Sequence, residues 1–384
     1  MKPLSKLVGE IPASGIRKFF DLVSEMEGVI SLGVGEPDFV TPWRIREAAI
    51  WSLEKGRTTY TSNYGLLELR EAICEKVCER YGVGYDPRTE VLVTVGVSEA
   101  LDVAFRALLD PGDEVLVPEP CFVSYKPCVS FAGGVPVPVP TSAETGFAIT
   151  LESLRERITE RTKAILLSFP TNPTGAVMTR EELQAVVDLC TENDLWILTD
   201  EIYDRLCYDA EHVCVASLRG ARERTIYLNG FSKAYAMTGW RIGYVCAPPE
   251  VIEMMMKVHQ YTMMCAPITG QLAALEAIRH GERDVEEMVT DYNQRRRLFV
   301  TGLNDLGLEC RLPGGAFYAF PSISKFGLTS EEFAERLLKE EKVLVVPGDV
   351  FGAGGEGHVR CCYATATVKL EEALERIGRF VGRL

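Results

Sequence analysis

The sequence predicts an α/β fold in which a mostly parallel, mixed sheet is flanked by helices, followed by a smaller α+β domain. Short apolar runs bounded by turn residues alternate with long amphipathic stretches, a pattern typical of strands that alternate with helices. From about residue 281 this alternation stops, and one long charged segment precedes a few short apolar runs. The chain has 384 residues, which is enough for two domains.

Six apolar runs are expected as strands of the main sheet: residues 91–95, 114–118, 163–169, 195–199, 225–229 and 241–247. A helix is expected over 98–109, between a glycine and the turn sequence Asp-Pro-Gly. A second is expected over 180–193, because Thr179 and Glu182 have the spacing of a capping box. The run VPVPVP at 135–140 indicates an edge strand, since proline cannot donate a ladder hydrogen bond.

The second part of the chain predicts a long helix over 282–307, short strands within 315–321 and 342–346, and a closing helix over 370–384. We therefore expect an N-terminal arm with part of the small domain at 1–41, a large domain at 42–284 and a small domain at 285–384. The arginine triplet at 295–297 is expected to form a solvated helix face.

Composition excludes several classes of protein. Lys and Arg number 41 and Asp and Glu 55, so the formal charge is −14, which disfavours nucleic-acid and anionic-membrane partners. No long apolar segment is present, and the first 15 residues lack the apolar core of a secretion signal, so we expect an unanchored cytoplasmic protein. The twelve cysteines contain no CxxC pair and the four histidines are isolated, so we expect reduced thiols and no metal site.

The segment NGFSKAYAMTGWRIGY at 229–244 contains the strongest chemical signal. It follows an apolar strand, so Ser232 and Lys233 are expected at the carboxyl end of that strand, where open α/β sheets bind ligands. Arg241 follows eight residues later. One amine and two anion-binding side chains in one crevice suit an amine that is bonded to a phosphorylated aldehyde.

Three other strands end in polar residues that fit the same ligand. Asp200 follows the strand 195–199, where a carboxylate can keep a pyridine nitrogen protonated, although a helix N-cap is an equally good interpretation of it alone. Asn172, in the turn sequence NPTG, offers an amide to a ring oxygen. Gly96 and the helix that begins near Ser98 provide backbone N–H groups for a phosphate.

These segments together resemble a known family. The chain is similar throughout its length to the pyridoxal-phosphate-dependent class I/II aminotransferases of fold-type I, in the subgroup with bacterial and archaeal aspartate and aromatic aminotransferases. The segments that carry the resemblance are SLGVGEPDF at 31–39, YTSNYGLLELREAI at 60–73, NPTG at 172–175, DEIY at 200–203, SKAYAMTGWRIGY at 232–244 and VRCCYATA at 359–366. The resemblance implies pyridoxal 5'-phosphate as cofactor and a transaminase of amino-acid metabolism and biosynthesis.

The resemblance also implies roles for individual residues. Lys233 is expected to bond covalently to the cofactor and then act as general base, Asp200 to pair with the pyridine nitrogen, and Asn172 and Tyr203 to contact the ring hydroxyl. The other cofactor contacts are expected from phosphate-binding residues and one ring-stacking residue: Gly96, Val97, Ser98, Ser232 and Arg241 for the phosphate, and Phe122 for the ring.

For the substrate, the resemblance implies that Arg360 clamps the α-carboxylate bidentately, with Asn172 and the backbone of Gly35 nearby. Tyr60 is expected to reach the cofactor phosphate of a neighbouring subunit, so the active unit is expected to be a homodimer. An L-amino acid would pass its amino group to the cofactor and a 2-oxo acid would then receive it, in ping-pong order.

The sequence indicates the identity of the amino-acid donor less strongly than it indicates the cofactor. Many similar aspartate aminotransferases have a lysine where this chain has Ser98, which favours an aromatic or other apolar donor here, with a 2-oxo acid such as 2-oxoglutarate as acceptor. Another basic residue, with Arg17 as a candidate, would instead allow an aspartate aminotransferase.

Three other classes of protein share parts of this pattern. Cysteine-S-conjugate β-lyases share the lysine, aspartate and arginine framework. Transcriptional regulators with this domain carry a DNA-binding module ahead of it, which we do not expect here. The glycines at 352, 354 and 357 match GxGxxG, but the following segment predicts a strand, so we expect a loop and not a dinucleotide site.

Overall fold

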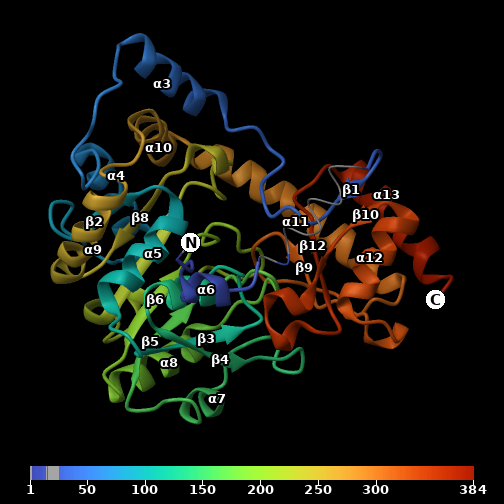
Figure 1. Ribbon diagram of the computed structural model, residues 1–384. Coiled ribbons are helices and arrows are strands. Elements are labelled where there is room, and N and C mark those ends of the chain that lie inside the picture. The colour runs from blue at the N-terminus through green and yellow to red at the C-terminus, as the bar shows by residue number, and fades with distance from the viewer. Residues whose placement is uncertain (1, 14, 16–25) are drawn as a thin grey trace.

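The computed structural model describes residues 2–13, 15 and 26–384. Its main sheet has seven strands in the order β2-β8-β7-β6-β5-β3-β4 (Figure 1). The bounds are β2 Val91–Thr94, β3 Glu114–Glu119, β4 Val135–Pro140, β5 Thr162–Leu167, β6 Trp196–Asp200, β7 Thr225–Gly230 and β8 Gly243–Cys246. Strand β8 runs antiparallel to both of its neighbours, and the other neighbouring pairs are parallel. The predicted mostly parallel, mixed sheet is confirmed, and β4 lies at an edge as its prolines indicate.

Helices cover both faces of this sheet, as parallel strands require. Alternate residues of β5 face opposite layers: Ala164 and Leu166 pack in the cluster that contains α5 (Gly96–Leu108), α6 (Tyr125–Phe131) and α9 (Pro249–Thr262). Ile165 and Leu167 pack in the cluster that contains α7 (Leu151–Arg155) and α8 (Arg180–Glu192). The expected capping box of α8 is present between Thr179 and Glu182.

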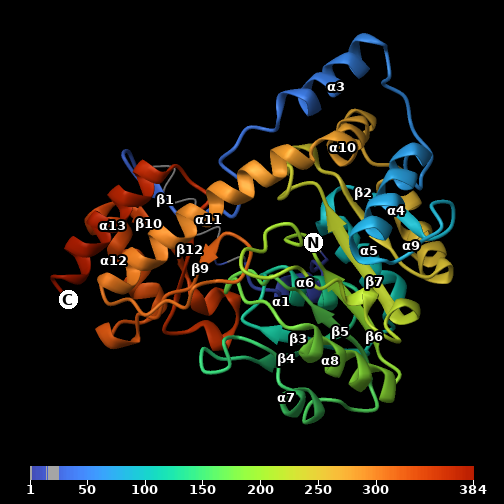
Figure 2. The same cartoon turned by 180° about the vertical axis from the view of Figure 1, so that it is seen from behind.

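Segments from the two ends of the chain build the second part of the molecule. The strands β11 (Val346–Pro347), β12 (Val359–Cys362) and β9 (Tyr318–Ala319) form an antiparallel sheet. A second small sheet pairs β1 (Ile30–Ser31) with β10 (Val343–Leu344) in parallel. Figures 1 and 2 show α11 (Glu282–Asp305) running from the main sheet toward this part. The expected long helix and short strands are thus present, whereas the domain boundaries at 41 and 284 stay a prediction.

The remaining helices are α1 (Lys6–Glu10), α3 (Trp43–Glu54), α4 (Leu67–Tyr81), α10 (Ile268–His280), α12 (Ser330–Glu341) and α13 (Thr367–Val381), which includes most of the expected closing helix. The glycines at 352, 354 and 357 lie in and around short 3₁₀ turns before β12, as expected for a loop. No helix within the described ranges has both the length and the apolar character needed to cross a membrane.

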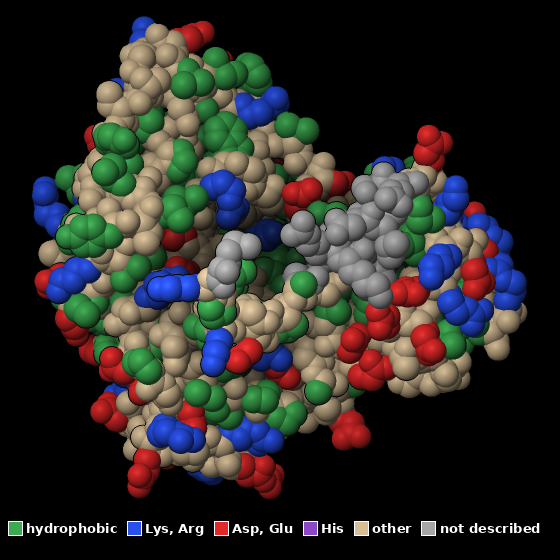
Figure 3. Space-filling view, viewed as in Figure 1, with side chains coloured by type: hydrophobic (Ala, Val, Ile, Leu, Met, Phe, Trp, Pro, Cys, Tyr) green, Lys and Arg blue, Asp and Glu red, His purple; other side chains and the backbone are tan. Residues whose placement is uncertain are grey.

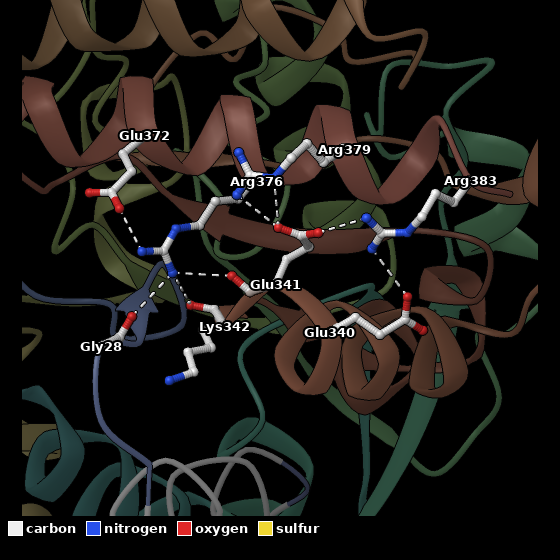
Figure 4. A network of polar contacts seen from close by, with 8 residues as sticks. All are labelled: Gly28, Glu340, Glu341, Lys342, Glu372, Arg376, Arg379 and Arg383. Carbon is white, nitrogen blue, oxygen red and sulfur yellow. Dashed lines mark hydrogen bonds and ion pairs between the residues drawn. The ribbon is translucent and has the colours of Figure 1, made fainter.

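A polar network on α13 joins the two ends of the chain (Figure 4). Arg376 donates to the carbonyl oxygens of Gly28 at 3.1 Å, Glu341 at 3.1 Å and Lys342 at 3.4 Å, and it pairs with Glu372. Ion pairs extend the network along the same helix: Arg379 with Glu341, and Arg383 with Glu341 and Glu340. The N-terminal segment that leads into the cavity described below is therefore anchored to the C-terminal helices.

The prediction of a solvated arginine triplet is wrong for two of its three residues. Arg295 and Arg296 are 7% and 0% exposed, and only the side chain of Arg297 is largely exposed. Arg295 donates to both carboxylate oxygens of Asp38 at 2.8 Å, and Arg296 pairs with Asp209 at 2.7 Å. The long helix buries two charged residues because segments distant in sequence bring their acceptors to them.

Candidate functional site

A cavity of about 320 Å³ lies at the carboxyl ends of the central parallel strands. Figure 3 shows that the molecule is hollowed between the part with the main sheet and the C-terminal part. Eleven of the residues that the sequence singled out line this cavity: Gly35, Val97, Ser98, Phe122, Asn172, Asp200, Tyr203, Ser232, Lys233, Arg241 and Arg360. They come from opposite ends of the chain, so only the fold brings them together.

Lys233 lies three residues beyond β7, and its Nζ donates to the carbonyl oxygen of Gly35 at 2.7 Å. Burial lowers its pKa to about 8, and the positive charges of Arg360 and Arg241 act in the same direction. With a pKa near 8, about one-tenth of the amine is neutral at pH 7, compared with about one in a few thousand for a free lysine. The site therefore increases the neutral, nucleophilic fraction of this amine.

This pKa predicts the pH dependence of covalent cofactor capture by the cofactor-free protein. Because only the neutral amine attacks an aldehyde, we expect the capture rate to rise about tenfold per pH unit below pH 8 and to level off above it. Stopped-flow absorbance with pyridoxal 5'-phosphate measures the rate, and Lys233→Ala provides the background. A midpoint near pH 10.4 would contradict the lowered pKa.

Asp200 is the last residue of β6 and is 4% exposed. Its carboxylate accepts hydrogen bonds from the Tyr125 hydroxyl at 2.9 Å and from the Ile202 amide at 3.2 Å. Burial raises the pKa of Asp200 to about 6, because removal from water disfavours the charged form of the carboxylate. No cation within the described ranges forms an ion pair with it that would offset this effect. A buried carboxylate with free acceptor capacity that faces a cavity suits a cationic N–H donor.

Arg360 lies on β12 and is 3% exposed. Its Nη1 donates to the Asn172 side-chain oxygen at 2.9 Å and its Nη2 to the Gly33 carbonyl at 2.6 Å. Its Nε has no hydrogen-bond partner among the described residues. A buried guanidinium with an unused donor and no paired carboxylate within the described ranges is suited to bind a carboxylate ligand.

The cavity also presents donors for an anion. Helix α5 begins at Gly96, and the first backbone N–H groups of any α-helix have no partner within it. The left-handed φ of Gly96 favours glycine, and a Cβ atom there would also lie 2.5 Å from Nη2 of Arg241, so this arginine packs closely against the turn. The helix N-terminus, Ser232 and Arg241 together fit a phosphate group.

Comparison with known proteins identifies the family of this chain. The sequence profile of "Aminotransferase class I and II" matches residues 27–377. The chain belongs to this aminotransferase family. The putative aminotransferase YugH of Bacillus subtilis is 55% identical over 98% of each chain, and aromatic-amino-acid aminotransferase 2 of Thermococcus litoralis is 47% identical over 98% of this chain and 97% of its own.

A solved structure extends the similarity to the whole fold. The aspartate aminotransferase of Thermus thermophilus with maleate has a TM-score of 0.94 and 43% identity, covering 99% of this chain and 100% of its own. This aminotransferase therefore has the expected fold-type I architecture and is a pyridoxal-phosphate-dependent transaminase that acts on small amino and oxo acids.

The cavity of this aminotransferase fits the cofactor of the family. Asp200 supplies a buried acceptor, the α5 N-terminus and Arg241 supply donors for an anion, and Lys233 supplies an amine. Both a ring that carries a protonated nitrogen and a phosphate group find matching partners.

Two predicted residues do not line the cavity. Gly96 lies directly behind Arg241, as described above. Tyr60 is 80% exposed and lines a separate hollow with residues 58–59 and 265–269. Tyr60 therefore does not reach the site of its own chain. Arg17, the candidate basic partner for an acidic substrate, lies outside the described residues.

Sequence reasoning missed two tyrosines of the cavity, Tyr125 and Tyr318. Tyr125 bonds Asp200, and its position three residues after Phe122 was the signal that could have found it. The hydroxyl of Tyr318 lies 2.7 Å from that of Tyr203, and its ring packs against the Arg360 guanidinium at 4.6 Å. No local signal marks Tyr318, since β9 is only two residues long.

Proposed function

We propose that this aminotransferase prefers aromatic or other apolar L-amino acids as donors and a 2-oxo acid such as 2-oxoglutarate as acceptor. The supporting observation is the charge of the cavity wall. Among the described residues that line it, the only cations are Lys233, Arg241 and Arg360. We assign them to the covalent bond with the cofactor, the phosphate and the substrate α-carboxylate, so none of them is left to bind a side-chain carboxylate of the substrate. The wall also contains Val34, Leu101 and Ile202, and a neutral serine stands at position 98.

The cofactor, when bound, supplies an electron sink that stabilises negative charge at the substrate Cα. We assign the phosphate to Ser232, Arg241 and the backbone N–H groups of the turn at 96–98. Asp200 would accept the hydrogen bond of the pyridine nitrogen, while Asn172 and Tyr203 would contact the ring oxygen. Phe122 would stack on the ring.

For the substrate, we assign the α-carboxylate to Arg360, whose guanidinium is buried with an unused Nε–H donor. The backbone of Gly35 lies at the same end of the cavity, where a Cβ atom would meet the Tyr318 hydroxyl at 2.3 Å. Lys233 Nζ would take the proton from the substrate Cα and then donate it to the cofactor carbon on the other side of the amino nitrogen, two atoms away. A base with a pKa near 8 is well matched to proton transfer at neutral pH.

We also propose that the active unit is a homodimer in which Tyr60 completes the partner's phosphate site. Tyr60 is exposed and remote from its own cavity. Large apolar side chains of α3 and of the end of α9 are also exposed, as is typical of interfaces: Trp43, Ile50, Trp51, Tyr261, Met263 and Met264. The twelve free cysteines favour a reducing compartment such as the cytoplasm.

A single-half-reaction panel tests the donor preference. The holoenzyme is mixed with Phe, Tyr, Asp, Glu, Ala or a cysteine conjugate, and the absorbance of the bound cofactor is followed as it is converted to its aminated form. We expect fastest conversion by Phe or Tyr. Fastest conversion by Asp would replace the proposal with an aspartate aminotransferase. Release of pyruvate and ammonia from the conjugate without an oxo acid would indicate a β-lyase.

A further inference from the structure

We propose that Glu99 and His259 form a buried pair that holds the turn at the start of α5 in the shape the cofactor phosphate needs. His259 is thereby a positioning residue for cofactor binding, although it does not line the cavity. This inference rests on the proposed function, because it takes the turn at 96–98 as the phosphate site.

The first observation concerns Glu99, which lies in the first turn of α5 and is 8% exposed. Its Oε2 accepts a hydrogen bond from the Val95 amide at 2.5 Å, directly before Gly96. On the other side of Val95, the Thr94 hydroxyl donates to the Gly96 carbonyl oxygen at 3.0 Å. Hydrogen bonds from the side chains of Thr94 and Glu99 therefore stabilise the turn, and Glu99 is the acceptor for the backbone amide of Val95.

The second observation concerns His259, which lies on α9 and is completely buried. Its Nδ1 is 2.5 Å from Oε1 of Glu99, so each carboxylate oxygen of Glu99 has one partner. Its Nε2 has no partner in the described part of the chain, so Glu99 is the one side chain there that the imidazole bonds. Without the imidazole, the almost fully buried carboxylate of Glu99 would lose one of the two hydrogen bonds that offset the cost of removing it from water.

The third observation is the tight packing between this turn and the other phosphate donors. A Cβ atom on Gly96 would lie 2.5 Å from Nη2 of Arg241, and one on Gly243 would lie 2.7 Å from the Val97 amide nitrogen. Little space therefore separates the turn from the segment that carries Arg241. A displaced turn would misplace Arg241 together with the N–H groups of Val97 and Ser98, and phosphate binding depends on the placement of such donors.

The test compares His259→Leu with His259→Gln in the full-length protein. Leucine removes the hydrogen bond to Glu99, whereas the glutamine amide can still donate one. We measure the dissociation constant of pyridoxal 5'-phosphate and the ³¹P resonance of the bound phosphate. For His259→Leu we expect about tenfold weaker binding or more and a shifted resonance, because an unpaired buried carboxylate will pull the turn out of place. For His259→Gln we expect binding within about threefold of wild type.

Two further variants complete the design. Thr329→Ala breaks the capping box of α12 in the C-terminal part, and it should lower stability without changing the ³¹P resonance. Glu99→Leu removes the bond to His259 together with the bond from the Val95 amide, so it should weaken cofactor binding at least as much, and it replaces His259→Leu if that variant does not fold.

The inference is overturned if His259→Leu binds the cofactor within twofold of wild type with an unshifted resonance, or if the Leu and Gln variants are equally weakened. Failure of the proposed function looks different. In that case the wild-type protein itself neither captures the cofactor on Lys233 nor converts it with an amino-acid donor.

Discussion

Lys233→Ala is expected to lose the visible absorbance of the covalently bound cofactor and to lower kcat/KM by about 10²- to 10⁴-fold from the loss of proton transfer alone. Lys233 is the only lysine among the described residues that line the cavity, so no second amine there could take over the covalent bond and the proton transfer that we assign to it. Borohydride reduction followed by peptide mass spectrometry checks the covalent bond, and steady-state kinetics checks the rate.

Lys369→Ala is the matched control, because Lys369 is an exposed lysine on α13 that does not line the cavity. It should retain wild-type absorbance and rate. Transamination by Lys233→Ala at a rate near that of wild type, or a cofactor adduct on another lysine of the wild-type protein, would refute the assignment of Lys233.

Asp200→Asn is expected to lower kcat/KM by about 10² to 10⁴-fold. Asparagine keeps the size of the side chain but removes the buried negative charge, so the pyridine nitrogen would lose the partner that we assign to it. Breaking a buried charge pair costs about 3–5 kcal/mol, and each 1.36 kcal/mol corresponds to a tenfold change in rate. Half-reaction kinetics with the preferred donor measure the loss.

A cofactor methylated on its ring nitrogen carries a permanent positive charge and should partly restore the rate of Asp200→Asn. Asp194→Asn, at a side chain that is 98% exposed, should leave the rate unchanged. A loss of less than threefold in Asp200→Asn, or no benefit from the methylated cofactor, would show that Asp200 does not act through the charge of the ring.

The sequence predicted the sheet and the residues at its strand ends for local reasons. The strands around β5, β6 and β7 are short apolar runs in the sequence, and parallel strands present their carboxyl ends at one edge of a sheet. Asp200 and Lys233 follow two such strands, so their proximity could be expected from the sequence alone. The capping box of Thr179 and Glu182 is equally local, because its two residues are only three positions apart.

Properties that depend on distant partners could not be predicted in this way. Arg296 has the same local sequence signal as its neighbour Arg297, yet only Arg296 is buried, because Tyr208 and the Pro313 carbonyl lie against it. His259 meets Glu99 across 160 residues of sequence, and Tyr318 meets Tyr203 across 115. Contacts of this kind leave no periodicity or spacing in the sequence.

The sequence by itself therefore determined the fold class, the family and the types of residue that line the cavity, since each of these follows from short motifs and strand ends. The tertiary structure alone decided how those residues behave. Burial, and not neighbouring sequence, lowers the pKa of Lys233 and raises that of Asp200. Desolvation depends on everything that packs around a group, and that environment exists only when the chain is folded.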